Sequence, residues 1–170
     1  MEQSRQATGH GSAGADKLFL LDAYALIFRA YYAFIRAPRI NTKGLNTSAI
    51  FGFFNTLEEL LALQPTHIGV AFDPAGGTFR HRAYPDYKAQ RDETPEGIRT
   101  AVPYIKQLLK AYRIPVLEVP DYEADDVIGT LATAAGAQGI DTYMVTPDKD
   151  YGQLVSDRVQ MLKPRNGSAG

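Results

Sequence analysis

The sequence predicts an α/β fold in which helices cover both faces of a mainly parallel β-sheet. Short apolar segments rich in β-branched and aromatic residues alternate along the chain with longer segments of helical periodicity. The 170 residues are enough for one domain, and 45% of them are hydrophobic, which is typical of a globular protein. Because parallel strands need long crossover connections, usually helices, this alternation indicates a single buried parallel sheet.

Five segments are predicted to form the strands of this sheet. Each is a short apolar run bounded by polar or turn-forming residues, as expected for strands that are buried on both faces. The four clear segments are 17–22, 67–73, 115–119 and 141–146, and a weaker one is 158–162. We therefore expect one domain over 17–164, with the polar ends at 1–16 and 165–170 forming flexible extensions.

Two helices are predicted between these strands. The first follows Thr47 or Ser48 as its N-cap. Its apolar face comprises Ile50, Phe53, Phe54, Leu57, Leu60 and Leu61. The second begins near Glu123 and is closed by Gly136 or Gly139. Helices of this length are suitable crossover connections between parallel strands.

The segment 76–97 does not follow the alternation, since it has no apolar periodicity. Thr94 and Pro95 within it are typical of an N-cap and first helical residue, and Pro103 is expected to break or restart the helix that follows. Residues 80–91 include four basic side chains and one acidic side chain, a net charge of +3. Basic residues interleaved with aromatic rings favour single-stranded nucleic acid, because cations bind its backbone and rings stack on unpaired bases.

The composition limits which metals this chain can bind. It has no cysteine and only three histidines, so disulfides and thiolate zinc sites are excluded. Any metal must therefore be held mainly by oxygen, which favours hard cations such as Mg²⁺ or Mn²⁺.

Acidic residues follow the carboxyl ends of the four clear strands. They are Asp22 after the first strand, Asp73 after the second, Glu123, Asp125 and Asp126 after the third, and Asp148 and Asp150 after the fourth. Ligands of open parallel sheets bind at this edge. Taken alone, any of these residues could be a turn or N-cap residue. Their agreement at four strand ends predicts a common site.

The region around the third strand is crowded with negative charge. Residues 118–126 include five acids and no base, and such crowding is costly unless a cation neutralises it. Two divalent cations ~3.5–4 Å apart can stabilise both the attacking and the leaving oxygen of a phosphodiester displacement. The leading hypothesis from these residues is therefore phosphate chemistry.

Several sequence blocks resemble those of one known family, the 5′ nuclease domain at the N-terminus of bacterial DNA polymerase I. These blocks are Phe-Leu-Leu-Asp22, Val-Ala-Phe-Asp73, Thr-Phe-Arg80-His-Arg-Ala-Tyr-Pro-Asp-Tyr-Lys88-Ala-Gln-Arg91, Tyr-Glu123-Ala-Asp125-Asp126 and Asp148-Lys-Asp150-Tyr-Gly-Gln-Leu. The resemblance implies a three-layer PIN-like fold with a mainly parallel central sheet and a basic arch insertion. It also implies kinship with the flap endonucleases.

The resemblance also implies a role for each matched residue. The first metal ion would be surrounded by Asp22, Asp73, Glu123, Asp125 and Asp126, and the second would be bound with the help of Asp148 and Asp150. Lys88 and Arg91 would act on the scissile phosphate, at the base of an arch threaded by the 5′ strand. The residues expected to contact DNA are Arg80, Arg82, Tyr87, Lys88 and Arg91. The expected cofactor is Mg²⁺ or Mn²⁺, with two ions in the complete domain.

The sequence departs from the pattern of this family in two ways. The family often has glycine where this chain has Ala23 and Asp121, and the extra acid at Asp121 should not remove a ligand. The family also has further aspartates and a clamp that grips the duplex beyond the point where this chain stops. No acid follows Asp157, so we expect the second metal site to be incomplete in this chain.

These observations predict metal-dependent hydrolysis of DNA from a 5′ end or a 5′ flap, in replication and repair. Polymerase domains would be covalently linked in a full-length protein. One alternative is a nucleic-acid-binding fragment with negligible cleavage. A second is a phosphatase or phosphoacceptor domain with Asp22 or Asp73 as nucleophile, which would leave the basic insert unexplained. No apolar run is long enough to span a membrane, and a cytoplasmic protein is expected.

Overall fold

A five-stranded parallel sheet forms the centre of the computed structural model, which describes residues 16–90 and 93–164. The predicted extensions at 1–16 and 165–170 lie outside the described residues, apart from residue 16. The strand order is β3-β2-β1-β4-β5, and every pairing is parallel. The strands are β1 (Lys17–Asp22), β2 (His67–Ala71), β3 (Val116–Leu117), β4 (Asp141–Val145) and β5 (Val159–Leu162).

The predicted strands are all present, but four of them are shorter than predicted. The largest difference is β3, which pairs with β2 only at Val116 and Leu117. It lies at the edge of the sheet, where it has one neighbouring strand instead of two. Strand β2 ends two residues before Asp73, so that this acid lies on the loop beyond the sheet.

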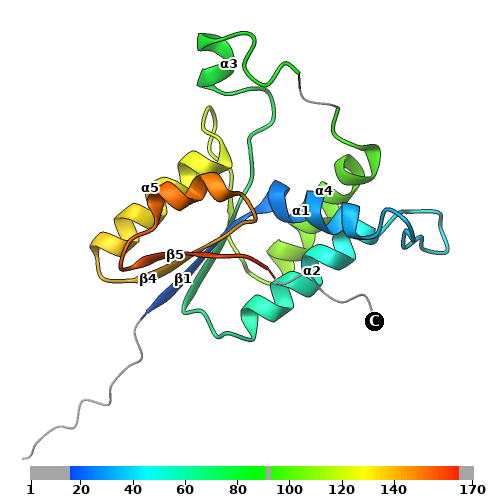
Figure 1. The fold of residues 1–170 in the computed structure, drawn as a ribbon. Helices are drawn as coiled ribbons and strands as arrows, with labels where there is room; N and C mark the ends of the chain where they lie inside the picture. The colour runs from blue at the N-terminus through cyan, green and yellow to red at the C-terminus, as the bar shows by residue number, and fades with distance from the viewer. Residues whose placement is uncertain (1–15, 91–92, 165–170) are drawn as a thin grey trace, which may run out of the picture.

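Helices cover both faces of the sheet, which gives the three layers that were predicted (Figure 1). One face is covered by α1 (Ala23–Ala33), α2 (Ser48–Leu61) and α4 (Glu96–Ala111). The other face is covered by α5 (Ala124–Ala137) and the 3₁₀ helix η1 (Lys149–Leu154). Each layer packs its own apolar cluster against the sheet. Among the described residues, no helix is long and apolar enough to cross a membrane.

Two helices on one face of the sheet differ from the sequence prediction. Helix α1 was not predicted; it starts directly after β1, and Asp22 is both the last strand residue and the helix N-cap. Helix α4 has Pro95 as its N-cap and continues through Pro103. The predicted break at Pro103 is therefore wrong. Ile98, Ile105 and Leu109 are fully buried in the core, and this packing keeps the helix intact despite the hydrogen bond that proline cannot donate.

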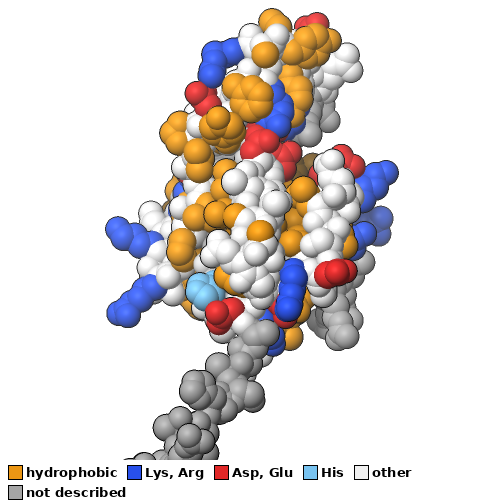
Figure 2. All heavy atoms as spheres, turned by 90° about the vertical axis from the view of Figure 1, so that its left-hand side faces the viewer, with side chains coloured by type: hydrophobic (Ala, Val, Ile, Leu, Met, Phe, Trp, Pro, Cys, Tyr) orange, Lys and Arg blue, Asp and Glu red, His pale blue; other side chains and the backbone are white. Residues whose placement is uncertain are grey.

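The insert projects away from the body of the molecule (Figure 1). Its described residues 76–90, here called the arch, contain the short helix α3 (Phe79–Ala83), which the sequence did not predict. Figure 2 shows that acidic and basic side chains meet where the projecting part joins the body. The arch follows Asp73 in the chain, and its Arg80 and Lys88 contact acids at the carboxyl edge of the sheet.

Candidate active site

The strand ends and the following helix starts position the acidic side chains. Asp22 ends β1, and its Oδ1 accepts the backbone N–H of Ala25 at 3.1 Å in the first turn of α1. Asp73, beyond β2, accepts the N–H of Ala124 at 2.7 Å through Oδ1. This second bond joins the end of β2 to the first residue of α5. Backbone amides at helix starts are unpaired donors, so they favour carboxylates at these places.

The remaining acids lie at the start of α5 and at the start of η1. Glu123 is the N-cap of α5, and Asp126 accepts the N–H of Glu123 at 3.1 Å. Asp148 is the N-cap of η1, and its Oδ1 accepts the N–H of Asp150 at 3.0 Å. These local bonds fix the acids close to the carboxyl ends of the parallel strands, where β1 and β4 form the point at which strand order reverses.

Two adjoining cavities contain all of the acids that the sequence singled out. The first has a volume of about 450 Å³ and is lined by Asp22, Asp73, Glu123, Asp125 and Asp148, together with Lys88 and Tyr151. The second, of about 820 Å³, is lined by Asp126 and Asp150, together with Arg80 and Tyr87. Four residues line both cavities: Lys88, Asp125, Asp148 and Tyr151. The acidic edge is therefore one continuous hollow.

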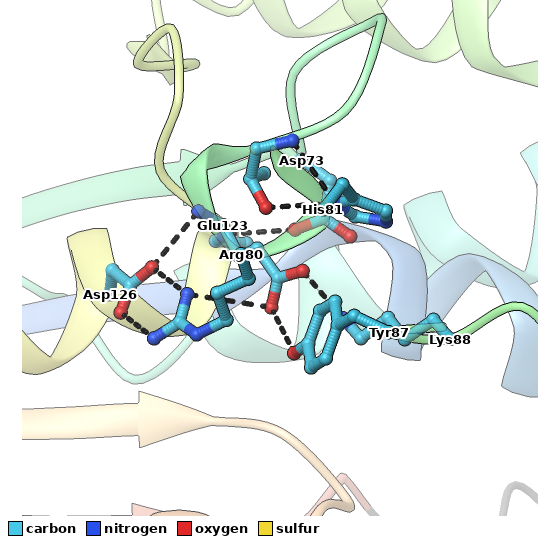
Figure 3. A network of polar contacts seen from close by, with 9 residues as sticks. Asp73, Arg80, His81, Tyr87, Lys88, Glu123 and Asp126 are labelled. Carbon is cyan, nitrogen blue, oxygen red and sulfur yellow. Dashed lines mark hydrogen bonds and ion pairs between the residues drawn. The ribbon is translucent and has the colours of Figure 1, made fainter. Parts of the chain in front are cut away.

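The arch supplies cations to two of these acids (Figure 3). Lys88 Nζ lies 2.8 Å from Glu123 Oε1, and the Tyr87 hydroxyl donates to Glu123 Oε2 at 3.0 Å. Arg80 donates to both oxygens of Asp126, at 2.6 and 2.7 Å. The side chain of Glu123 is only 3% exposed, so its charge needs such partners. The arch thus closes over the acids at the start of α5.

The acids differ in how their charge is stabilised. Burial, with the nearby charge of Asp73, raises the pKa of Asp22. Burial and the charges of Asp126 and Glu123 likewise raise the pKa of Asp125. Burial also acts upward on Glu123, but the hydrogen bond and charge of Lys88 lower the pKa of this carboxyl below its usual range. The hydrogen bonds from Arg80 lower the pKa of Asp126.

The donor set of the hollow fits a hard divalent cation. Its charged groups are carboxylates and arch cations, and neither cavity is lined by histidine or cysteine. Oxygen ligands of this kind suit Mg²⁺ and Mn²⁺. Within 16–90 and 93–164, no three acidic or histidine side chains stand in the arrangement of a formed metal site. Glu123 and Asp126 instead direct their oxygens towards arch cations.

Three residues singled out by the sequence either line neither cavity or lie outside the described residues. Arg91 is outside the described residues. Arg82 lines neither cavity and instead pairs with Asp121 at 2.6 Å, with both side chains largely exposed. Asp121 has φ of +72°, in the left-handed region that glycine adopts without strain. This backbone conformation gives a physical reason for a glycine at the same place in similar sequences.

Two residues that contact Asp22 were not predicted from the sequence, Tyr151 in the lining of the hollow and Thr146 behind it. The hydroxyls of Thr146 and Tyr151 each donate to Asp22 Oδ2 at 3.3 Å. Burial and the neighbouring charge of Asp22 raise the pKa of Tyr151, so its phenol stays protonated and remains a donor. A hydroxyl at the end of a strand and a tyrosine near two acids carry no distinctive spacing. Only the fold shows that both reach Asp22.

The sequence of this chain is similar to one family model and to several bacterial proteins. The family model described as "5'-3' exonuclease, N-terminal resolvase-like domain" matches residues 17–169. The DNA polymerase I of Treponema pallidum (strain Nichols) is 46% identical over 147 residues, which are 86% of this chain and 15% of that protein. The 5'-3' exonuclease of Aquifex aeolicus (strain VF5) is 39% identical over 150 residues, 88% of this chain and 51% of that protein. This chain therefore spans a small part of the DNA polymerases and about half of the exonuclease.

Solved structures share the fold at low sequence identity. The structure of T5 5'-exonuclease with bound divalent metal ions (zinc) matches with a TM-score of 0.62 and 20% identity, covering 88% of this chain and 56% of that one. The catalytic core of Rad2 in complex with a DNA substrate matches with a TM-score of 0.51 and 20% identity, covering 86% of this chain and 42% of that one. These likenesses establish the architecture.

Proposed function

The chain belongs to the 5′-3′ exonuclease family through its N-terminal resolvase-like domain, and from this premise we propose that it hydrolyses phosphodiester bonds of DNA at 5′ ends or 5′ flaps. One observation carries the proposal above the rest. Five carboxylates and the Lys88 ammonium line a single cavity at the carboxyl ends of a parallel sheet. Hydrolysis of a phosphodiester uses both kinds of residue. The carboxylates hold metal cations, and these cations together with the lysine offset the negative charge of the transition state.

The proposal includes two divalent cations, Mg²⁺ or Mn²⁺. The first is assigned to Asp22, Asp73, Glu123, Asp125 and Asp126, and the second to Asp148 and Asp150. When bound, such cations supply Lewis-acid stabilisation of the charge that develops on the phosphate. The cavities support part of this division, since Asp22, Asp73 and Glu123 line the first and Asp150 lines the second, while Asp125 and Asp148 are common to both and Asp126 lines only the second.

The chain's own cations act on the substrate phosphates. Lys88 offsets charge on the scissile phosphate, and Arg91 is assigned the same role. Arg80, Arg82 and Tyr87 are assigned to contacts with the DNA strand, in which arginines position phosphates. In this structure Lys88 and Arg80 are paired with Glu123 and Asp126. Binding of DNA and metal therefore requires the Lys88 and Arg80 side chains to exchange these acids for phosphate oxygens.

The wider context is also part of the proposal. The DNA polymerase I of Geobacillus stearothermophilus is 42% identical over 154 residues, and these are 17% of its length. By this similarity, we assign the domain to a longer polymerase in which polymerase domains are covalently linked to it, and to the cytoplasm. The substrate would then be the 5′ ends and 5′ flaps of the DNA on which such a polymerase acts.

Cleavage of a labelled DNA with a single 5′ flap tests the proposal. The chain is incubated with the flap DNA in Mg²⁺, in Mn²⁺ or in EDTA, and the products are separated by length. Short 5′ products that form with metal and not with EDTA would support the nuclease. A blunt duplex of the same sequence is the comparison substrate: cleavage of the flap DNA alone would indicate action at flaps, and cleavage of both would indicate action at any 5′ end.

A second candidate function is nucleic-acid binding without cleavage. It is favoured by the internal pairing of Glu123 and Asp126 with the arch, which leaves these acids unavailable to a cation. The same experiment separates the two functions when DNA binding is measured alongside cleavage. Retention of the flap DNA at all metal concentrations, with no product, would replace the nuclease by the binding function.

A further inference from the structure

Asp22 is held by donors at both of its carboxylate oxygens. Its Oδ1 accepts the N–H of Ala25 at 3.1 Å, while its Oδ2 accepts the hydroxyls of Thr146 and Tyr151, each at 3.3 Å. These donors come from three elements: α1, the end of β4 and η1. Rotation of the carboxylate about its Cβ–Cγ bond would break bonds on both oxygens together, so the group has one favoured orientation.

The two hydroxyls are buried, and their position leaves Asp22 as their acceptor. Thr146 is 0% exposed and Tyr151 is 4% exposed. Thr146 Oγ1 accepts the N–H of Asp148 at 3.1 Å, so its own proton is directed to Asp22. Thr146 thereby connects the acid at the end of β1 with the acid that follows β4. The Tyr151 ring packs in the apolar cluster under α5, which fixes the position of its hydroxyl.

These bonds decide how much of Asp22 is available to a ligand in the cavity. An ionised carboxylate offers about four acceptor positions on its two oxygens. Ala25 uses one position on Oδ1, and the two hydroxyls use both positions on Oδ2. The remaining position is on Oδ1, and Asp22 lines the 450 Å³ cavity. Asp22 is thus prepared to contact a cation through one oxygen.

We propose that Thr146 and Tyr151 are positioning residues, which hold Asp22 so that a single oxygen faces a divalent cation in the cavity. The inference rests on the proposed function, because that function assigns a cation to Asp22. It adds two residues that act on the cation through Asp22. Donors behind a ligating carboxylate fix its orientation, and their loss weakens metal binding.

Binding of Mn²⁺ to the chain without DNA tests the inference directly. Affinity is measured by electron paramagnetic resonance or calorimetry for Tyr151→Phe and Thr146→Val, which remove one hydroxyl each and keep the packing. We expect each to weaken Mn²⁺ binding by about tenfold. Thr146→Ser keeps the hydroxyl, and Tyr104→Phe removes one from the half-exposed face of α4. Both controls should bind Mn²⁺ within about twofold of the wild type.

A double-mutant cycle distinguishes positioning from a general loss of structure. If Tyr151 acts through Asp22, the effect of Tyr151→Phe disappears in an Asp22→Ala background. An equal loss of affinity in that background would overturn the inference, as would unchanged affinity of both hydroxyl variants. Unfolding midpoints in EDTA check the fold of each variant, and the Thr146→Val and Thr146→Ser pair decides the matter if Tyr151→Phe is unfolded.

The outcome for the wild type separates this inference from the function beneath it. A wild-type chain that binds Mn²⁺ and cuts flap DNA, with variants that bind Mn²⁺ equally well, would overturn the positioning role alone. A wild-type chain that binds no Mn²⁺ would overturn the proposed nuclease function and this inference together.

Discussion

The acids of the hollow fall into two regions that differ in the charge placed next to them. Glu123 and Asp126 face Lys88 and Arg80 of the arch, and their pKa values are lowered. Asp22 accepts bonds only from neutral N–H and O–H donors among the described residues, and its pKa is raised. Glu123 is almost fully buried, yet its pKa falls. Burial is the largest influence on Asp22 and raises its pKa, whereas on Glu123 the contacts with Lys88, Tyr87 and Arg80 together outweigh burial.

The comparison indicates where an external cation would gain most. The arch already neutralises Glu123 and Asp126, whereas Asp22 is repelled by Asp73, and Asp125 by Asp126 and Glu123. Asp22 and Asp125 each have a raised pKa to which a neighbouring acid contributes. Such repulsion lowers the stability of the fold without metal, and a cation that relieves it is bound more tightly. Sites that trade stability for function commonly show this pattern.

Replacing Asp125 by asparagine should produce the largest effect. Asp125 lines both cavities and has no arch cation bonded to it in the described structure. We expect metal-dependent cleavage of flap DNA to fall at least about 100-fold, as when one electrostatic partner of a transition state is removed. The unfolding midpoint in EDTA should rise slightly, since the variant removes one of the repelling charges. Single-turnover cleavage and thermal unfolding measure the two effects. Retained cleavage would contradict the assignment of Asp125.

Removing the Lys88 side chain should lower the stability of the fold, because, among the described acids of the hollow, only those next to the arch pair with a cation of the chain. In EDTA, Lys88→Ala leaves Glu123 buried without its ammonium partner, and we expect a loss of about 1–3 kcal/mol. A divalent cation should recover part of this loss, because it replaces the missing charge. Denaturant unfolding in EDTA and in Mn²⁺ measures both values. Residue 88 has a left-handed backbone, with φ of +61°. Alanine and lysine both carry a Cβ, so the substitution leaves the backbone strain at this position similar.

A second lysine provides the control for this prediction. Lys106 is paired with Glu118, and the side chains of both are about one-third exposed, at 33% and 31%. Lys106→Ala should cost no more than about 1 kcal/mol, with no dependence on metal. An equal, metal-independent loss for Lys88→Ala and Lys106→Ala would mean that the arch pair is an ordinary surface contact.

The sequence predicts the sheet and its acids well because those signals are local. The strands are short apolar runs, and Glu123 is the expected start of α5. Helix α1 was missed because its residues are almost all apolar or aromatic and follow β1 with only Asp22 between the two apolar runs. The break expected at Pro103 was wrong because core packing on one side of α4 outweighs the missing hydrogen bond.

The pairing within the hollow could not be predicted from the sequence. Lys88 and Glu123 are 35 residues apart, and Tyr151 and Asp22 are 129 apart. No local spacing signals such contacts, since they depend on the path of the arch and on the strand order. The sequence therefore indicates which residue types gather at the edge of the sheet. The fold decides which acids obtain a cation from the chain and which obtain only neutral donors.

The two regions should respond to acid with opposite signs. The folded pKa of Asp22 is raised, so the folded state binds more protons than the unfolded state between that pKa and the unfolded value of about 4. Its titration therefore adds stability as the pH falls through this window. The folded pKa of Asp126 is lowered, so its contribution is present above about pH 4 and is lost below it.

Unfolding in EDTA over a series of pH values measures both contributions. The stability of the wild type relative to Asp22→Asn should rise as the pH falls from neutral towards about 4. The stability of the wild type relative to Asp126→Asn should instead fall as the pH drops below that value. Curves of the same sign for the two variants would show that the arch cations do not set the difference between the regions.

The smallest effect is expected at the exposed pair that Arg82 of the arch forms with Asp121. The atoms of this pair are as close as those of Arg80 and Asp126, at 2.6 Å, but the two side chains are 64% and 49% exposed. Asp121→Gly and Asp121→Ala both remove the pair, whose contribution in water is small. They differ because only alanine keeps a Cβ at φ of +72°. We expect the glycine variant to be more stable than the alanine variant by about 1 kcal/mol, measured by denaturant unfolding. If both variants instead lost as much stability as Lys88→Ala, burial would not explain why the Lys88–Glu123 pair contributes more stability than the Arg82–Asp121 pair.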